Sequence, residues 1–350
     1  MTALEGNIEP ARLRPRRPQG PLPLAVEVEG LEKRFATTVA LAGIDLAISQ
    51  GSVYALLGPN GAGKTTTIRI LTTLLTPDAG WARVLGEDVV RQAGAVRRRI
   101  ALTGQFATVD EDLTGWENLV FLGRLAGLTR GAAKARAADL LASVGLEASA
   151  RRQLKIFSGG MRRRLDLAAS LIVSAELYFL DEPTTGLDPA SRAQVWEVIR
   201  SLAASGATVL LTTQYMDEAD RLADRIAVID RGVVVAEGTP GDLKASVGAG
   251  TLQVRLANPA RRPDAERVLA RVLRGAATVT ADPSRLIARM LPEVTPGAAS
   301  ERAAAAVAQL VREGVGVNEF ALGQPSLDEV FLALTSRDST GDGAGKEATR

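Results

Sequence analysis

A glycine-rich segment that follows an apolar run has the residue types needed to hold a nucleotide. It fits the pattern G-x-x-x-x-G-K-[ST], in which backbone amides surround phosphates, and consists of Gly58, Pro59, Asn60, Gly61, Ala62, Gly63, Lys64, Thr65 and Thr66. The run Ser52–Leu57 predicts a buried strand before it, and Thr65–Leu75 predicts a helix after it. We expect Lys64 to reach the β- and γ-phosphates, and the Thr65 hydroxyl to coordinate Mg²⁺. The alternative, a glycine-rich turn without a ligand, does not account for this strand–loop–helix order.

A phosphate-binding loop alone does not separate kinases, GTPases and transport ATPases, and two carboxylates narrow the choice. Asp181 and Glu182 end the apolar run Leu177–Leu180, which predicts a strand with both acids at the carboxyl edge of the sheet. We expect Asp181 to hold Mg²⁺, directly or through water, and Glu182 to polarise the attacking water as a general base. A solvated acidic strand end is the alternative.

A second turn of the anion-binding type precedes the amphipathic helix Arg162–Val173. It consists of Ser158, Gly159 and Gly160, and the amides of a helix N-terminus can bind an anion. A helical stretch separates this turn from the first loop, so one chain does not bring both to the same phosphate. We therefore expect it to serve a nucleotide held by a second copy of the protein.

The elements that position these residues read as an α/β domain. From Ala25 to about Leu243, β-branched runs alternate with helical periods. Short buried strands are predicted over Ile100–Thr103, Leu177–Leu180, Thr208–Leu211 and Ile226–Ile229. The stretch Thr114–Val173 lacks a strand pattern and predicts a helical insertion between two core strands.

The pattern changes after Gly250. Strands are predicted over Thr251–Leu256, Ala277–Ala281, Leu286–Leu291 and Val315–Leu322, and helices over Asp264–Leu273 and Ser300–Arg312. The order β-α-β-β-α-β predicts a small ferredoxin-like α+β domain. Ser326 and Glu329 have capping-box spacing and open a last helix through Leu334. We place this accessory domain at residues 250–336.

Composition excludes several classes of protein. The chain has no cysteine, which excludes disulfides and thiolate metal sites and fits a reducing cytosol, and it has no histidine. Its net charge of +2 gives no argument for nucleic acid. No segment has the roughly 20 apolar residues of a membrane helix, and we expect neither a signal peptide nor a membrane span, so a partner must supply any spanning part. Residues 1–23, rich in Pro and Arg, predict a disordered arm, with docking to acidic lipid headgroups as the alternative, and residues 337–350 predict a disordered tail.

The motifs together resemble the ATP-binding subunit of an ABC transporter. They are the 58–66 loop, Gln105, the Ser158 turn, the Asp181–Glu182 pair and Gly186-Leu187-Asp188. The resemblance implies the fold of a P-loop NTPase, namely an ABC-type nucleotide-binding domain over residues 24–245 with a helical subdomain at about 114–173.

The resemblance also implies partners and further roles. Two copies pack head to tail, and each ATP lies between the 58–66 loop of one and the Ser158 turn of the other. Gln105 then senses Mg²⁺ or the γ-phosphate and contacts an integral-membrane permease. Asp188 lies at the dimer interface, and the Phe35 ring stacks on adenine. The protein would then be cytoplasmic, peripheral at the cytoplasmic face of the membrane.

Two residues depart from the family pattern. Gln214 stands where most members have a histidine that contacts the γ-phosphate, and Met161 stands where glutamine is usual. Glutamine donates a hydrogen bond but carries no charge, so we expect hydrolysis, at a reduced rate. Gln214 and the segment Gln324–Phe331 resemble the daunorubicin/doxorubicin-resistance branch, which implies efflux of hydrophobic drugs through a separately encoded permease.

Two other classes of protein stay open. One is a soluble ABC-type ATPase that acts on nucleic acid or ribosomes, against which the single ATPase unit and the small net charge argue. The other is a regulatory subunit that binds ATP without hydrolysing it. Gln214 favours this second class, and Glu182 argues against it.

Overall fold

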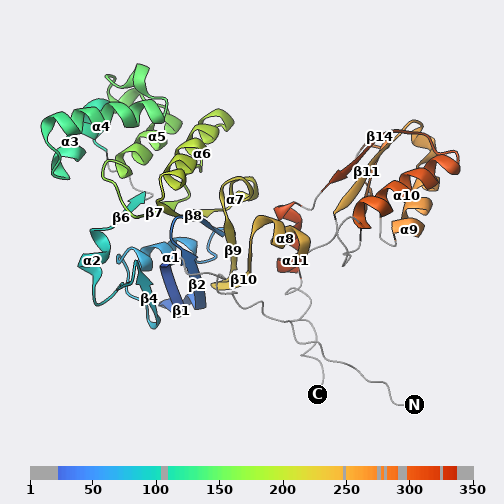
Figure 1. Cartoon of the computed structure of the whole chain (residues 1–350), viewed down its shortest axis with the longest axis horizontal. Coiled ribbons are helices and arrows are strands. Elements are labelled where there is room, and N and C mark those ends of the chain that lie inside the picture. The colour runs from blue at the N-terminus through green and yellow to red at the C-terminus, as the bar shows by residue number, and fades with distance from the viewer. Residues whose placement is uncertain are drawn as a thin grey trace, which may run out of the picture. The chain divides into compact units, whose positions relative to one another are not determined.

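A computed structural model of the chain describes residues 23–103, 109–246, 250–273, 277–279, 282–290, 298–323 and 326–336 (Figure 1). The described residues belong to two compact units, one ending at Thr239 and the other beginning at Pro240. The predicted arm before Pro23, the tail at 337–350, and Gln105 and Gln324 lie outside the described residues. Among the described residues, no helix combines the length and the apolar character needed to cross a bilayer.

A six-stranded sheet forms the centre of the first unit. Its strand order is β10-β9-β3-β8-β7-β6, with β3 (Val53–Leu57), β6 (Ile100–Thr103), β7 (Leu177–Asp181), β8 (Thr208–Thr213), β9 (Arg225–Asp230) and β10 (Val233–Gly238). All neighbours in this sheet are parallel except β9 and β10. Every residue of β3, β7 and β8 is buried, which explains why these strands are unbroken apolar runs in the sequence.

The register of the parallel strands decides where the functional residues meet. Leu57 pairs with Thr213, and Asp181 pairs with Thr212. The carboxyl ends of β3, β7 and β8 therefore lie at one edge of the sheet, as the sequence predicts.

A second, antiparallel sheet in this unit was not expected from the sequence. Its order is β2-β1-β4-β5, with β1 (Leu24–Phe35), β2 (Thr38–Ser49), β4 (Ala79–Val84) and β5 (Glu87–Asp88). The alternation of buried Val26 and Val28 with polar residues in β1 is the signal for such a half-covered sheet.

Helix α1 (Lys64–Leu71) contacts strands of both sheets and shares one core with them. It ends four residues before the predicted Leu75. Thr73 adopts a left-handed backbone conformation with φ of 66°, and the amides of Leu74 and Leu75 bond back to the Arg69 carbonyl. The short helix α2 (Ala93–Arg97) follows, and α6 (Pro189–Ala204) and α7 (Met216–Leu222) flank β8 in the sequence.

The insertion between β6 and β7 is helical, as predicted. It contains α3 (Gly115–Leu125), α4 (Arg130–Ser143) and α5 (Gly159–Ser170), with two short 3-10 turns at Glu147–Ser149 and Leu154–Ile156. Figure 1 shows the three helices grouped together. Threonine or serine caps begin all three, and Thr114 forms a complete capping box with Glu117.

The second unit begins with α8 (Pro240–Ser246), which packs on the last helix, α11 (Leu327–Ser336). Between them lie β11 (Thr251–Leu256), a 3-10 turn at Pro259–Arg261, α9 (Arg262–Leu273), β12 (Ala277–Val279), β13 (Arg285–Arg289), α10 (Ala298–Arg312) and β14 (Val317–Gly323). The four strands form an antiparallel sheet of order β12-β13-β11-β14. Buried residues of β11, α9 and α10 make its core. The element order is the predicted β-α-β-β-α-β, and the assignment to the ferredoxin-like folds stays a prediction.

Candidate nucleotide-binding site

The loop between β3 and α1 is shaped by close contacts that exclude side chains. A Cβ atom added at Gly58 would lie 2.2 Å from the carbonyl oxygen of Ile229. Gly63 has φ of +111°, and a Cβ there would lie 2.7 Å from Leu41 Cδ2 and 2.8 Å from the Ala40 oxygen. Glycine is required at both positions, because the chain passes too close for any other residue.

The loop is also tied to its surroundings by backbone hydrogen bonds. The Gly58 amide donates to the Thr213 carbonyl at 3.2 Å, and the Gly232 amide donates to the Ala62 carbonyl at 3.0 Å. Pro59, Asn60 and Gly61 at its tip are exposed, while Thr65 and Thr66 are half-buried. The loop is thus a fixed rim with an accessible tip.

Lys64 is a buried cation at the start of α1. Its side chain is 3% exposed, and Nζ donates to the carbonyls of Gly58 at 2.8 Å and Pro59 at 3.0 Å. The ammonium lies 3.5 Å from Glu182 Oε1. Burial lowers the pKa of Lys64, and the charges of Glu182 and Asp181 oppose that fall. Any further anion that approaches the loop therefore stabilises the charged form of Lys64.

Asp181 brings three elements together at the carboxyl edge of the sheet. The carboxylate is buried, and its Oδ1 accepts from Thr65 Oγ1 at 3.2 Å and from Thr212 Oγ1 at 2.6 Å. Two oxygens of the kind that Mg²⁺ prefers, Thr65 Oγ1 and Asp181 Oδ1, are thus adjacent. Among the described residues no group of three or more His, Cys, Asp or Glu side chains could hold a metal by itself. This fits Mg²⁺, which takes one or two protein carboxylates and completes its shell with waters and phosphates.

Glu182 has an unusual backbone conformation for a residue with a side chain. Its φ is +50°, in the left-handed region, which costs about 1–3 kcal/mol and persists only where the surroundings enforce it. Its amide donates to the Thr212 carbonyl and hydroxyl at 3.2 and 3.0 Å, and Thr185 Oγ1 donates to its Oε2 at 3.2 Å. These hydrogen bonds enforce the strained conformation, in which the carboxylate lies beside Lys64.

Arg163 of α5 holds the end of β7 from the other side, and sequence reasoning missed it. Its guanidinium donates to the carbonyls of Asp181 at 2.8 Å, Glu182 at 2.6 Å and Pro183 at 3.3 Å. Arg162 and Arg164 flank it in the sequence, so nothing in the residue pattern distinguishes the middle arginine. Only the fold shows which of the three contacts the backbone carbonyls at the end of β7.

Ser158 caps α5, which begins at Gly159, three residues before the predicted start at Arg162, and ends at Ser170, three residues before the predicted Val173. Ser158 Oγ accepts from the Met161 amide at 3.2 Å, and Ser158 and Gly159 are exposed. A Cβ added at Gly159 would have no atom within 4 Å, whereas one at Gly160 would lie 3.7 Å from Asp188 Oδ2. In the described part of the chain no hydrogen bond or ion pair joins this turn to the 58–66 loop.

The remaining predicted residues are placed as follows. Phe35 ends β1 with an exposed ring, and the Lys33 ammonium lies 5.8 Å from its centroid. The hairpin that follows leads directly to Ala40 and Leu41, which contact Gly63. Gln214 directly follows β8 and is half-buried. Gln105 lies outside the described residues, so its predicted roles at the metal and the nucleotide stay predictions.

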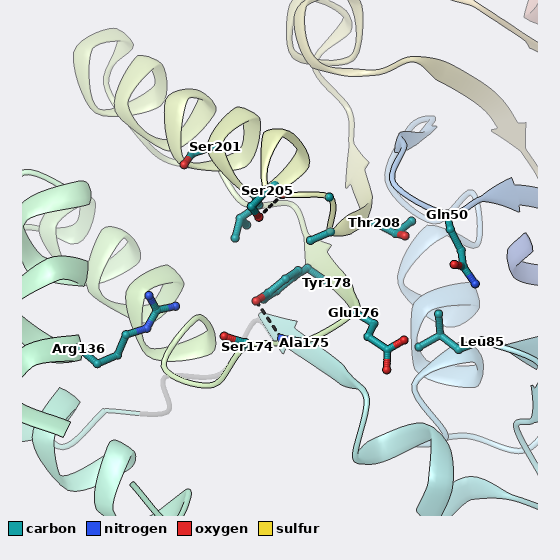
Figure 2. A pocket seen from close by; sticks show the side chains of 13 residues that line it. Gln50, Leu85, Arg136, Ser174, Ala175, Glu176, Tyr178, Ser201, Ser205 and Thr208 are labelled. Carbon is teal, nitrogen blue, oxygen red and sulfur yellow. Dashed lines mark hydrogen bonds between the residues drawn. The ribbon is translucent and has the colours of Figure 1, made fainter. Parts of the chain in front are cut away.

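A described pocket lies elsewhere in the first unit. It has a volume of about 610 Å³ and is lined among others by Gln50, Arg136, Glu176 and Thr208 (Figure 2). Thr208 begins β8 and Glu176 precedes β7, so the pocket lies at the amino edge of the sheet, away from Asp181. None of the predicted site residues lines it.

Comparisons with known proteins show the family of this chain. The model of the ABC transporter family matches residues 41–185. A daunorubicin/doxorubicin resistance ATP-binding protein, DrrA, of Streptomyces peucetius is 54% identical over 311 residues, 89% of this chain and 92% of the relative. A Nod factor export ATP-binding protein I of Ralstonia nicotianae is 45% identical over 218 residues, 62% of this chain and 68% of the relative. A solved structure of an ATP-binding subunit of an ABC transporter has a TM-score of 0.57 at 29% identity, and the match covers 63% of this chain and 92% of that one.

The phosphate-binding loop, the paired carboxylates and the parallel sheet define an ATP-binding subunit of an ABC transporter, which binds ATP and couples its hydrolysis to transport. The chain belongs to this family and, within it, to the daunorubicin/doxorubicin resistance ATP-binding proteins.

Proposed function

We propose that this chain hydrolyses ATP with Mg²⁺ at a site shared by two copies, and thereby powers efflux of a hydrophobic drug through a separate membrane permease. The observation that carries the proposal is the meeting of Lys64, Glu182, Asp181 and Thr65 at one edge of the sheet. It unites a phosphate-binding cation, a metal ligand pair and a base.

Each residue has a role that its chemistry supports. The amides of residues 58–66 hold the phosphates, and Lys64 neutralises the charge on the β- and γ-phosphates. Thr65 and Asp181, with Gln105, would hold Mg²⁺, which would supply further positive charge to the phosphate oxygens. Glu182 accepts the proton of the attacking water.

Three further features complete the pocket. The Phe35 ring is exposed and stacks on adenine, an interaction that contributes about 1–3 kcal/mol per base in related settings. Gln214 donates a hydrogen bond to the γ-phosphate from the end of β8. The exposed turn Ser158-Gly159-Gly160 supplies amides to the nucleotide of the second copy. Its exposure and its open surroundings support this role.

The transported compound is inferred from the names of the relatives. One is named for daunorubicin/doxorubicin resistance and another for Nod factor export, and efflux of a drug is consistent with both names. No described helix spans a membrane, and a separate permease supplies the path. The chain then works at the cytoplasmic face of the membrane.

Two substitutions test the shared site. Glu182→Gln keeps the volume of the side chain but removes the base, so ATP still binds while phosphate release falls by about 10²–10⁴-fold. Size-exclusion chromatography with ATP should then show a persistent dimer. Lys64→Ala, the matched control, should lose nucleotide affinity and remain a monomer. A Glu182→Gln variant that stays monomeric at saturating ATP would overturn the two-copy site.

Transport is tested separately. Inverted membrane vesicles that contain the chain and its permease should accumulate doxorubicin only with ATP, and Lys64→Ala should abolish the accumulation. Equal accumulation with and without ATP would contradict the proposed export function.

A further inference from the structure

A buried carboxylate that the proposed chemistry does not use lies four residues after Gln214. Glu218 of α7 is 0% exposed. Its Oε1 accepts two hydrogen bonds, from Thr184 Oγ1 at 2.8 Å and from Trp196 Nε1 at 3.1 Å. The two donors come from different parts of the chain, so a single side-chain oxygen connects three segments.

Each of these segments leads to the nucleotide site. Thr184 stands two residues after Glu182, in the turn that leaves β7. Trp196 lies in α6, which begins after Asp188, and Asp188 Oδ1 caps that helix by accepting from the amides of Ala190 and Ser191. Glu218 itself belongs to the helix that follows Gln214.

Further contacts tie α6 to the turn after β8. The Arg192 guanidinium lies 4.7 Å from the centroid of the Tyr215 ring, and its Nη1 lies 3.3 Å from Asp217 Oδ2. The Arg221 guanidinium lies 5.4 Å from the Trp196 ring. Arg192 and Trp196 of α6 thus each contact two residues of the 215–221 segment, and the Glu218–Trp196 hydrogen bond is the buried one of these contacts.

Burial of a carboxylate at this position costs desolvation free energy. Glu218 Oε2 is buried without a hydrogen bond of good geometry among the described residues, and the Thr213 side chain lies near enough to the carboxyl to lower its pKa. Burial raises the pKa of Glu218, and the hydrogen bonds it accepts oppose that rise only in part. An apolar side chain would avoid this penalty, so packing alone does not explain the residue.

We propose that Glu218 is a positioning residue for hydrolysis, which holds the Gln214 turn in register with Glu182 and with the Asp188 helix. The inference rests on the roles proposed for Gln214 and Glu182. With the connection intact, the turn after β8, the turn after β7 and helix α6 move as one body. When the nucleotide displaces Gln214, Asp188 then moves with it.

The connection reaches the loop that binds the phosphates through no direct contact. The Thr213 carbonyl, the Gly232 amide and the start of β2 hold the 58–66 loop, whereas Glu218 meets Thr213 only at its side chain. Loss of the connection should therefore lower kcat and leave the KM for ATP nearly unchanged.

Substitutions at both ends of the hydrogen bond test this. Glu218→Leu removes the acceptor at similar volume, and its kcat should fall about tenfold or more with the KM for ATP changed less than about twofold. Glu218→Gln keeps an acceptor oxygen and should restore kcat to within about threefold of the wild type. Glu197→Gln, on the exposed face of α6, is the matched control and should leave both values unchanged.

Trp196→Phe removes the donor of the same hydrogen bond, so it tests the connection even if the Glu218→Leu variant misfolds. It should also lower kcat selectively, and the Leu and Phe changes combined should cost less than the product of the two single effects. Wild-type kcat in both Glu218→Leu and Trp196→Phe, or independent effects in the double variant, would overturn the inference.

Trp196 also reports on the proposed movement. In a Trp81→Phe/Trp116→Phe background, ATP should change the emission of Trp196, and Glu218→Leu should abolish the change. An unchanged emission in a background that forms the ATP-dependent dimer would contradict transmission through α6. Absence of hydrolysis in the wild type would instead count against the proposed function itself.

Discussion

The two glycine-containing turns that precede α1 and α5 both present helix N-termini, yet they are built in opposite ways. The 58–66 loop is enclosed: Gly58 and Gly63 have no room for a Cβ, and Lys64 is buried against Glu182. The Ser158 turn is open: Ser158 and Gly159 are exposed, and Gly159 has free space around it. The 58–66 loop is fixed by contacts within its own chain. The Ser158 turn has the exposure expected of a surface that contacts another molecule.

The largest expected difference between the two turns is seen with alanine. Gly63→Ala places a Cβ against Leu41 and Ala40 at positive φ, so it should destabilise the first unit by about 1–3 kcal/mol and lower ATP affinity about 100-fold or more. Gly159→Ala meets no atom and should keep both the Tm and ATP binding, while phosphate release falls because the added methyl lies on the open face. Thermal unfolding and nucleotide titration measure the two effects. Equal loss of ATP affinity in both variants would erase the distinction between an enclosed and an open turn.

Arg163 connects the helix that begins at the open turn to the backbone carbonyls of Asp181 and Glu182. Arg163→Met leaves the carbonyls of Asp181 and Glu182 without this donor, which costs about 1–3 kcal/mol and loosens the strained backbone at Glu182. We expect kcat for ATP hydrolysis to fall about tenfold with ATP affinity retained. The Arg162 guanidinium pairs with exposed Glu111, so Arg162→Met should change kcat by less than about threefold. Indistinguishable kinetics of the two variants would remove Arg163 from the site.

The capping role of Ser158 is separated from its proposed role toward the second copy by a matched cap. Ser158→Ala and Thr114→Ala each remove a helix N-cap and should each destabilise the first unit by about 1 kcal/mol. Only Ser158→Ala should also lower phosphate release, measured at saturating ATP. If Thr114→Ala lowers phosphate release as much, the effect of Ser158 is one of stability alone.

The smallest expected effect concerns pH. The pKa of Glu218 is raised in the folded state, chiefly by burial and further by Asp217, so the folded protein holds this proton more tightly than the unfolded chain. Its favourable contribution is complete below the unfolded pKa and is lost as pH rises through the folded pKa. Glu218→Gln stays neutral, so its Tm relative to the wild type should rise as pH increases, with about 2–4 °C for each 1 kcal/mol. A Tm difference that is constant with pH would contradict the raised pKa.

Much of the first unit is specified locally in the sequence. The apolar runs predicted the places of β3, β6, β7, β8 and β9, and β3, β7 and β8 need no polar residues because every residue in them is buried. The glycine pattern predicted the enclosed loop, and the steric contacts of Gly58 and Gly63 explain why. The end of α1 was misjudged, since the left-handed turn at Thr73 has no glycine to mark it.

Other features depend on contacts between residues far apart in the chain. In the antiparallel sheet β2-β1-β4-β5, strand β1 pairs with β4, and the chain between these two strands contains the phosphate-binding loop and α1. No local sequence pattern indicates this pairing. The same holds for Arg163, one of three consecutive arginines, and for Glu218, one acid in a helix of several. Which arginine meets the carbonyls after β7, and which glutamate is buried against Trp196, is decided by how the helices pack.

The sequence by itself determined the family of this protein and the places of its candidate functional residues: a glycine-rich loop, two carboxylates after an apolar strand, and a second glycine-containing turn. These motifs are short, and each depends on residue types within a few positions of one another. The tertiary structure alone decided which side chains hold the motifs in place, because the register of the parallel strands and the packing of α5, α6 and α7 bring together residues that are 18–34 positions apart.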